Sequence, residues 1–363
     1  MQLELEVLQT TSKNDVVPSS NKGYSLWLAA VYIASFMAGM GILAMPHGLA
    51  GMGWYGVILI SLACANSWYG AMMLGRCWMI LEERWAEYRG KFRYPYPAIG
   101  MRAAGPWMRF AAIGALGTAA LACVILAVAL LLKLPLGDPK PTYGGVDFST
   151  FSLAFGTTLF SFGGSFMCPT VHNDMKDRNQ FHKASIVSFI AIFVLYVPVT
   201  VLGYALVGET VPPNILAAIE DGPLKMFVDA CLAVHVFLAF LLAINPVAQE
   251  MEEVFNVPPE FNYKRCLIRS TIVGLVLLIG YAVPHFDKIL NLIGGSTMTL
   301  LTFILPPIFY LLLIKGNSPK NDQKTMSLFE KIYLVQVIVV GIAGGISCTY
   351  FAVVDIIEVF LHD

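Results

Sequence analysis

The chain has 363 residues, of which 57% are hydrophobic and only 13% charged, whereas a soluble domain carries about a quarter charged residues. The mean hydropathy of +0.69 leaves too little polar surface to coat a water-soluble fold of this length. A formal charge of −1 provides no basic field for a polyanion, which excludes nucleic acid as a partner. The composition therefore predicts an all-α integral membrane protein whose solvent is the lipid bilayer.

Nine segments are apolar enough to cross a bilayer, which takes about 20 residues per helix. They are residues 24–49, 53–76, 107–132, 148–172, 184–208, 224–245, 266–285, 287–314 and 329–352. We expect a transmembrane region at 24–352, a polar N-terminal tail at 1–23 and a C-terminal tail at 353–363. In the loop 77–106, the stretch from Cys77 to Tyr94 has apolar residues at helical spacing, which is typical of an interfacial helix or of a solvated amphipathic linker.

Lysine and arginine residues indicate how the spans are oriented, because short loops rich in them stay in the cytoplasm. With a cytoplasmic N-terminus, 19 of the 23 basic residues fall in inside segments. Only Lys133, Lys140, Lys225 and Lys288 fall outside. We therefore predict a cytoplasmic N-terminal tail, a cytoplasmic loop at 77–106 and an extracytoplasmic C-terminal tail.

Two predicted spans carry a glycine five residues before a proline. These pairs are Gly41 and Pro46 in the first span, and Gly164 and Pro169 in the fourth. Glycine lowers the penalty for unwinding, and proline removes a backbone donor and crowds the carbonyl one turn back. Both helices are therefore expected to break, and the freed backbone groups must line a wet cavity or bind something. The alternative is that these residues serve close packing and mild kinks, as they often do in membrane helices.

The two spans run in opposite directions under the charge count, as the halves of an inverted repeat do. Paired interrupted helices are the best sequence pointer to the binding site of a secondary transporter. Half-helix amino termini attract a carboxylate and unwound carbonyls hold a cation, so the expected ligand is a small zwitterion. The residues expected to supply substrate contacts are Gly39, Met40, Gly41, Ser161, Phe162, Gly163, Gly164 and Ser165, with Pro46 and Pro169 maintaining the breaks.

Three stretches carry a family resemblance: GMGILAMPHGLAGMGW (39–54), LFSFGGSFMCPTVHNDMKD (159–177) and PYPAIGMRAAG (95–105). They resemble the first helix, the broken sixth helix and the segment before the third helix of the amino acid/auxin permease family, which contains proton-coupled and vesicular amino-acid transporters. The resemblance implies eleven helices of the five-plus-five inverted-repeat type and symport of amino acids with H⁺ or Na⁺. It implies no cofactor, and a plasma, vesicular or lysosomal membrane.

The sequence departs from this family in two places. After Phe110, where the third helix should begin, the chain continues with residues 111–131, which look more like the family's fifth helix, so two helices are expected to be missing. A splice variant, an imperfect gene model or a divergent short transporter would each give this result. Ser165 stands where many relatives carry histidine, which weakens a proton-coupling role at that position. The alternative to a transporter is a non-transporting amino-acid sensor or a regulatory partner of a full-length relative.

Few ionisable residues lie within the spans, where burying them is costly. His47, His235 and Asp229 are candidates for proton coupling, and each histidine has the alternative of a neutral packing residue. Asp229 and His235 are six residues apart and do not share a helix face, so a direct relay between them is not expected. His172 and Asp174, at the inner end of the fourth span, are interpreted as a solvated interfacial pair.

Other motifs point away from an enzyme. The sequence has no nucleophile elbow, no P-loop and no His-Glu-x-x-His zinc motif. The seven cysteines lie in or beside apolar segments and form no Cys-x-x-Cys pair, so we expect neither disulfides nor a metal site.

Overall fold

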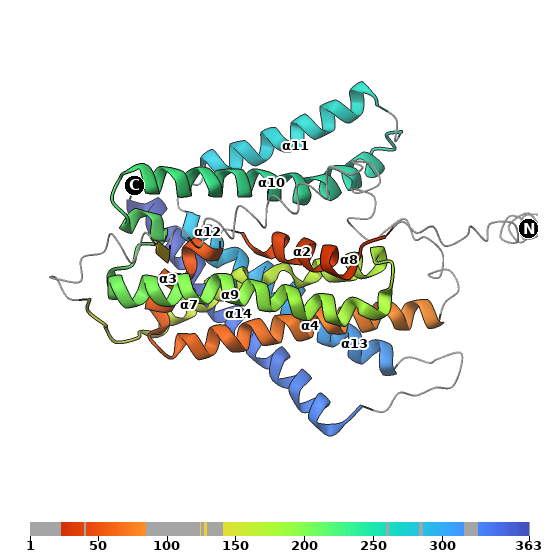
Figure 1. The fold of residues 1–363 in the computed structure, drawn as a ribbon, viewed down its shortest axis with the longest axis horizontal. Helices are drawn as coiled ribbons and strands as arrows, with labels where there is room; N and C mark the ends of the chain where they lie inside the picture. Colours follow the sequence, from red (N-terminus) through yellow and green to blue (C-terminus); the bar gives the residue numbers. More distant parts are fainter. Residues whose placement is uncertain are drawn as a thin grey trace, which may run out of the picture.

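A computed structural model describes residues 23–84 except Met40, together with 124, 127–128, 141–258, 261–282, 286–315 and 326–362. In this part of the chain, six helices are long and apolar enough to cross a membrane, and a bent helix pair at the start makes a seventh. Apart from one isolated bridge between Tyr24 and Met175, the ordered elements described are all helical (Figure 1). The predicted all-α membrane fold with discontinuous helices is confirmed.

Eight of the nine predicted spans correspond to described helices, and the remaining span, 107–132, lies almost wholly outside the described residues. In chain order the elements are α2 (Leu26–Met37), α3 (Gly41–Met52), α4 (Gly56–Arg84), α7 (Phe148–Ser161), η2 (Gly163–Met167), α8 (Cys168–Asp174), η3 (Arg178–Gln180), α9 (Phe181–Val207), η4 (Gly208–Thr210), η5 (Ile215–Ala218), α10 (Pro223–Val254), α11 (Tyr263–Ala282), α12 (Phe286–Ile293), η6 (Gly294–Met298), η7 (Leu300–Ile304), α13 (Leu305–Lys315) and α14 (Leu328–His362). The helix α11 is not among the six that meet the length and hydropathy test, and 283–285, the last residues of that predicted span, are not described.

Three helices run further than the sequence predicts, and one of them, α10, continues past residue 245 to Val254. The helix α4 continues without interruption through Cys77 to Arg84, so the first part of the predicted interfacial helix is the end of the second span. The rest of the loop up to residue 106 lies outside the described residues. At the other end of the chain, α14 continues to His362, so the predicted C-terminal tail is largely helical. Hydropathy marks where a helix leaves the apolar layer, but it does not mark where the helix ends.

The span that contains α12 and α13 is irregular in a way that the sequence analysis missed. Its centre consists of two successive π-helical segments, η6 and η7. The Thr299 hydroxyl donates to the Gly294 carbonyl at 2.7 Å, which satisfies one acceptor inside the widened coil. Segments of π-helix are rare and occur frequently at functional sites. This span therefore joins the two predicted broken spans as a third irregular crossing.

At each end of the bundle, the segments that contact each other are ones that the charge count places on the same side of the membrane. The Tyr24–Met175 bridge joins two segments that the charge count places inside. At the opposite end, Lys288 pairs with Asp355 at 2.7 Å, and both belong to predicted outside segments. We call these ends the inner end and the outer end, following the predicted orientation, and which of them faces the cytoplasm stays a prediction.

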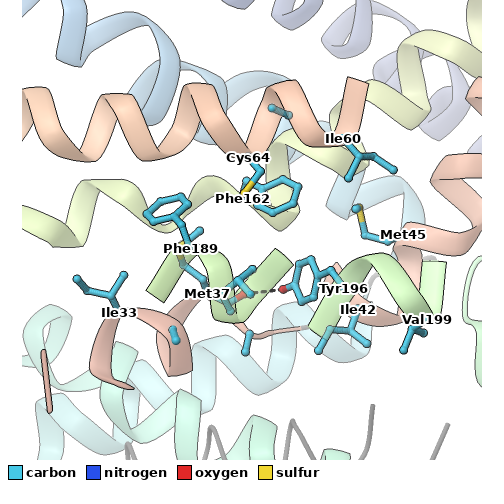
Figure 2. Close-up of a cluster of buried hydrophobic side chains, with 14 of the residues drawn as sticks. Ile33, Met37, Ile42, Met45, Ile60, Cys64, Phe162, Phe189, Tyr196 and Val199 are labelled. Atoms are coloured by element: carbon cyan, nitrogen blue, oxygen red, sulfur yellow. Dashed lines mark hydrogen bonds between the residues drawn. The ribbon is translucent and has the colours of Figure 1, made fainter. Parts of the chain in front are cut away.

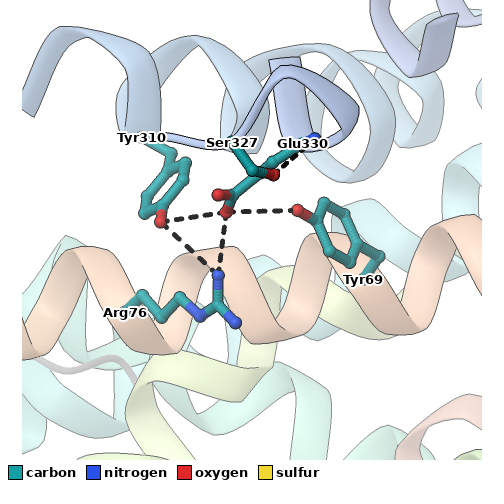
Figure 3. A network of polar contacts seen from close by, with 5 residues as sticks. All are labelled: Tyr69, Arg76, Tyr310, Ser327 and Glu330. Carbon is teal, nitrogen blue, oxygen red and sulfur yellow. Dashed lines mark hydrogen bonds and ion pairs between the residues drawn. The ribbon is translucent and has the colours of Figure 1, made fainter. Parts of the chain in front are cut away.

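A polar network at the inner end joins α4, α13 and α14 (Figure 3). The Glu330 carboxylate accepts hydrogen bonds from Arg76 at 3.0 Å, from Tyr310 at 3.2 Å and from Tyr69 at 3.5 Å. Arg76 and Glu330 both lie in segments that the charge count places inside. The network ties the start of the last span to the second span, away from the broken helices.

Close helix packing at η6 gives a test of the fold. A Cβ atom at Gly294 would collide with the backbone carbonyl of Gly156 on α7, whereas a Cβ atom at Gly274 on α11 meets nothing within 4 Å. We expect Gly294→Ala to destabilise the protein by about 1–3 kcal/mol, the usual cost of overpacking, and Gly274→Ala to leave it unchanged or slightly more stable, since alanine favours helix. Thermal unfolding in detergent measures both, and a Gly294→Ala midpoint equal to the native one would contradict this packing.

Candidate functional site

The first span is interrupted between α2 and α3. The two helices meet at an angle of 59°, and residues 38–40 between them are not helical or, at Met40, lie outside the described residues. The Gly39 amide donates to the Met37 carbonyl at 2.7 Å in a tight turn. The sequence placed Pro46 at this break, but Pro46 lies inside α3, five residues after its start. The glycine-containing stretch, rather than the proline, is therefore where this helix opens.

The fourth span is interrupted between α7 and α8. Here the chain passes through the 3-10 segment η2 before α8 begins at Cys168. Pro169 lies in the first turn of α8, where its missing backbone donor leaves no helical hydrogen bond unmade. This break differs from the first because the chain stays coiled, with a tighter pitch, instead of turning sharply.

The two breaks lie directly against each other. A Cβ atom at Gly164 in η2 would run into the side chain of Met37, at the end of α2. One at Gly41, the first residue of α3, would lie 2.5 Å from the Ser161 hydroxyl oxygen at the end of α7. Glycine is thus required on both sides of the contact, because any side chain would separate the two interrupted helices.

The half-helices of the two broken spans also contact each other in matching pairs, outer half with outer half and inner half with inner half. In the described part of the chain, α3 packs mainly against α7 and α9, and α2 packs against α9, η2 and α8. The outer halves of the two broken spans therefore contact each other, and so do their inner halves. This is the arrangement expected of two antiparallel broken helices related by an inverted repeat.

Backbone carbonyls freed at the breaks are bound by hydroxyl groups from three other helices. Tyr196 on α9 donates to the Met37 carbonyl at 2.7 Å, a bond drawn in Figure 2. Ser67 on α4 donates to the Phe162 carbonyl at 2.5 Å. Thr302 in the π-helical segment η7 donates to the Gly163 carbonyl at 3.0 Å. All three hydroxyl residues are buried or nearly so, and these bonds remove the cost of leaving the carbonyls unsatisfied in an apolar layer.

The packing around the breaks is largely apolar. Figure 2 shows Phe162 beside Tyr196, with Met37 and Ile42 on the side of α2 and α3. The rings of Phe162 and Tyr196 are 5.8 Å apart. Within this environment the Ser165 hydroxyl is buried and has no hydrogen-bond partner among the described residues. It is a polar group at the break that is available to a ligand.

The candidate residues of the two spans have different positions relative to this contact. Gly41, Phe162, Gly163, Gly164 and Ser165 are buried at it. Ser161 lies there too, but its hydroxyl donates to Thr157, one turn back in its own helix, at 2.8 Å. Gly39 is partly buried, and Met40 lies outside the described residues.

The three candidates for proton coupling are not at the breaks. His47 on α3 donates from Nδ1 to the Val211 carbonyl at 2.6 Å, which ties the loop after η4 to the outer end of α3. His235 is 1% exposed on α10, and Asp229 lies on an exposed part of the same helix. Their different burial agrees with the expectation that these two do not share a face. The principal contacts of α10 in the described part are with α11 and α2.

Sequence reasoning missed Ser67, Tyr196 and Thr302. The available signal was a polar side chain inside an apolar span, since such residues hydrogen-bond across membrane helices. That signal does not select them, because Thr158, Thr200 and other hydroxyl residues in the spans bond to their own helix one turn back. Only the three-dimensional arrangement shows which hydroxyl meets a freed carbonyl.

The fold and the paired breaks define a multi-pass membrane protein with discontinuous helices, and comparison with known proteins identifies its family. Residues 22–136 and 137–354 match the family described as Transmembrane amino acid transporter protein. Amino acid transporter AVT3C of Arabidopsis thaliana is 28% identical over 254 residues, which are 70% of this chain and 54% of that protein. The Vesicular GABA transporter of Caenorhabditis elegans is 24% identical over 226 residues, 59% of this chain and 45% of that protein.

The chain belongs to this transmembrane amino acid transporter family. It spans about half the length of the curated relatives AVT3C and AVT3B.

The hydrogen bond from Thr302 to the second break can be tested with two substitutions, one that removes the hydroxyl group and one that keeps it. Thr302→Val keeps the volume but leaves the Gly163 carbonyl buried without its donor, so we expect a loss of about 1–3 kcal/mol of stability. Thr302→Ser keeps the hydroxyl and should recover most of this loss. Thermal unfolding of the two variants in the same detergent decides the matter, and equal destabilisation by valine and serine would show that the hydroxyl bond contributes nothing.

Proposed function

We propose that this chain is a secondary active transporter that moves amino acids across a membrane by alternating access. The observation that carries the proposal is the contact between two broken helices, Met37 against Gly164, in a chain that belongs to an amino acid transporter family. The names of its relatives, which are amino acid transporters and a vesicular GABA transporter, support the substrate class.

The chemistry at the breaks suits a small zwitterion with a neutral side chain. The amino terminus of α3, at Gly41, presents backbone donors and a positive dipole end for a carboxylate. The Met37 carbonyl already accepts both the Gly39 amide and the Tyr196 hydroxyl, so the Gly163 carbonyl, which accepts the Thr302 hydroxyl, is the better candidate to bind an ammonium group. The Ser165 hydroxyl supplies a further polar contact. The surrounding Phe162 and Met37 side chains are apolar and carry no charge for an ionic substrate side chain.

Coupling and location complete the proposal. We infer coupling to H⁺ or Na⁺, a cytoplasmic tail at 1–23, a transmembrane region at 24–352 and an extracytoplasmic C-terminal end. A plasma membrane or a vesicular or lysosomal membrane fits the relatives, one of which is named a vesicular transporter. The proposed role is transport and not catalysis.

Uptake of labelled neutral amino acids into proteoliposomes, with and without a pH or Na⁺ gradient, tests the proposal. We expect gradient-dependent uptake, and a decrease of about tenfold or more in Gly41→Ala, because the added methyl group would push Ser161 away and cost about 1–3 kcal/mol at the contact. Gly274→Ala, whose added methyl group meets nothing within 4 Å, should transport normally. Absence of substrate-dependent flux under every gradient would contradict transport, and full flux in Gly41→Ala would contradict the site.

A second candidate function follows from the departure of the sequence after Phe110. Because two helices of the usual eleven are expected to be missing there, the chain would bind an amino acid without cycling. It would then act as a sensor or as a regulatory partner of a full-length relative. Thermal stabilisation by an amino acid without flux would favour the sensor, and co-purification with a longer homologue would favour the partner.

A further inference from the structure

Buried polar side chains without hydrogen-bond partners gather around the inner half of the two broken spans. In the described part of the chain they include Tyr24, Tyr32, Trp68, Ser165, His172 and Ser185, from α2, α4, η2, α8, α9 and the residues just before α2. Most buried polar groups in proteins are satisfied, and unsatisfied ones call for a ligand, water or a functional role. This half of the molecule is therefore built to receive something polar between the breaks and the inner end.

His172 is the histidine of this cluster, and its side chain is buried. Its side chain on α8 is 1% exposed, and its ring lies 4.5 Å from the ring of Phe181. Its Nε2 atom is 3.2 Å from the Arg178 carbonyl oxygen. A carbonyl only accepts, so Nε2 carries the hydrogen, and the other nitrogen, Nδ1, holds a lone pair in the neutral ring.

No described hydrogen-bond donor reaches the lone pair of Nδ1, and Gly75 lies next to this atom. Nδ1 has no hydrogen-bond partner among the described residues. It faces Gly75 on α4, where an added Cβ would lie 3.6 Å from Nδ1. The imidazole thus presents an unused proton-accepting atom where α8 packs against α4 and against Phe181 of α9.

The other titratable groups near His172 do not supply this proton. On its own helix, Asp174 lies near the Tyr24 and Tyr32 side chains. Arg178 approaches from η3, where its guanidinium donates to Asn173 at 2.8 Å. On α9, Phe181 contacts the ring while His182 and Lys183 are exposed. On α4, Arg76 and Cys77 face Glu330 and Tyr310 instead.

His172 also adjoins the bridge that joins the two inner half-helices. The Tyr24 amide donates to the Asp174 carbonyl at 2.8 Å, and the Lys176 amide donates to the Tyr24 carbonyl at 2.9 Å. The Met175 amide donates to the His172 carbonyl at 3.3 Å. Opening of the inner end by parting α8 from α2 and α4 would break this bridge and remove the cover from Nδ1.

We propose that His172 is a proton-binding site of the inner half, neutral while the bridge is closed and protonated at Nδ1 when the inner end opens. A hydronium ion at the inner end gives up the proton: one of its O–H bonds breaks, the Nδ1–H bond forms, and a water molecule is left. This inference rests on the proposed transport function and makes H⁺ the coupling ion. Because the open form binds the proton more tightly, acid on that side favours opening by linkage.

Hydrogen exchange of the bridge amides tests the proposal without any substrate. The full chain in lipid nanodiscs is compared at about pH 7.5 and about pH 5.5, on either side of the ordinary histidine pKa of about 6.5. After correction for intrinsic exchange, the Tyr24 and Lys176 amides should exchange about tenfold faster at the lower pH, since one pH unit below the pKa shifts the open population by about that factor. His172→Gln should abolish the acceleration, and the exposed control His182→Gln should keep it.

A native protein without this pH response, or a His172→Gln variant that retains it, overturns the proposal. A second measurement avoids any effect of the substitution on folding: with ¹⁵N-labelled histidine in the native protein, His172 should show a bare Nδ1 at the higher pH and two protonated ring nitrogens at the lower one. A ring that is charged, or neutral, at both pH values also overturns it. Because neither readout uses flux, a failure of uptake counts against the transport function alone.

Discussion

The architecture depends on one constraint, which is that a backbone carbonyl freed inside an apolar layer must find a donor. Both broken spans release such carbonyls where their helices stop. The protein satisfies three of them with the hydroxyls of Tyr196, Ser67 and Thr302, each from a different helix. The breaks are therefore stable because α4, α9 and the span of η7 surround them, and no single segment could hold them alone.

The same bonds couple the breaks to the rest of the bundle. Ser67 and Thr302 bind adjacent carbonyls of one break, so α4 and η7 meet at η2. The π-helical coil at η6 and η7 lets this crossing approach α7 so closely that Gly294 cannot carry a side chain. At the inner end, the Tyr24–Met175 bridge ties the two inner half-helices together.

Much of this organisation could be predicted from the sequence, because hydropathy and basic residues report directly on membrane crossing. The described helices begin near the predicted residues, although α4, α10 and α14 end well beyond them. Pairs such as Lys288 with Asp355 join loops predicted to lie on one side. The position of the first break was less predictable. Proline indicated that α3 is irregular, but Pro46 is accommodated inside the helix, and the chain opens at the glycine-containing residues before it.

The rest required three-dimensional information for physical reasons. Many hydroxyl residues lie in the spans, and whether one bonds within its own helix, like Thr158, or across to a freed carbonyl, like Thr302, depends on helix rotation and depth. The π-helical segments have no distinct sequence signal. His172 looked like a solvated residue because it is near the end of a span, and its burial arises from Phe181 and Gly75, which lie on other helices.

The central claim is that two interrupted helices touch at their breaks and are held there by hydroxyl groups. A cryo-electron density map of the protein in lipid nanodiscs, at a resolution that traces carbonyl groups, measures this directly. The account predicts non-α-helical chain at 38–40 and 162–167, with Met37 against Gly164 and the Tyr196 hydroxyl on the Met37 carbonyl. Two continuous α-helices, or breaks that face away from each other, would contradict it.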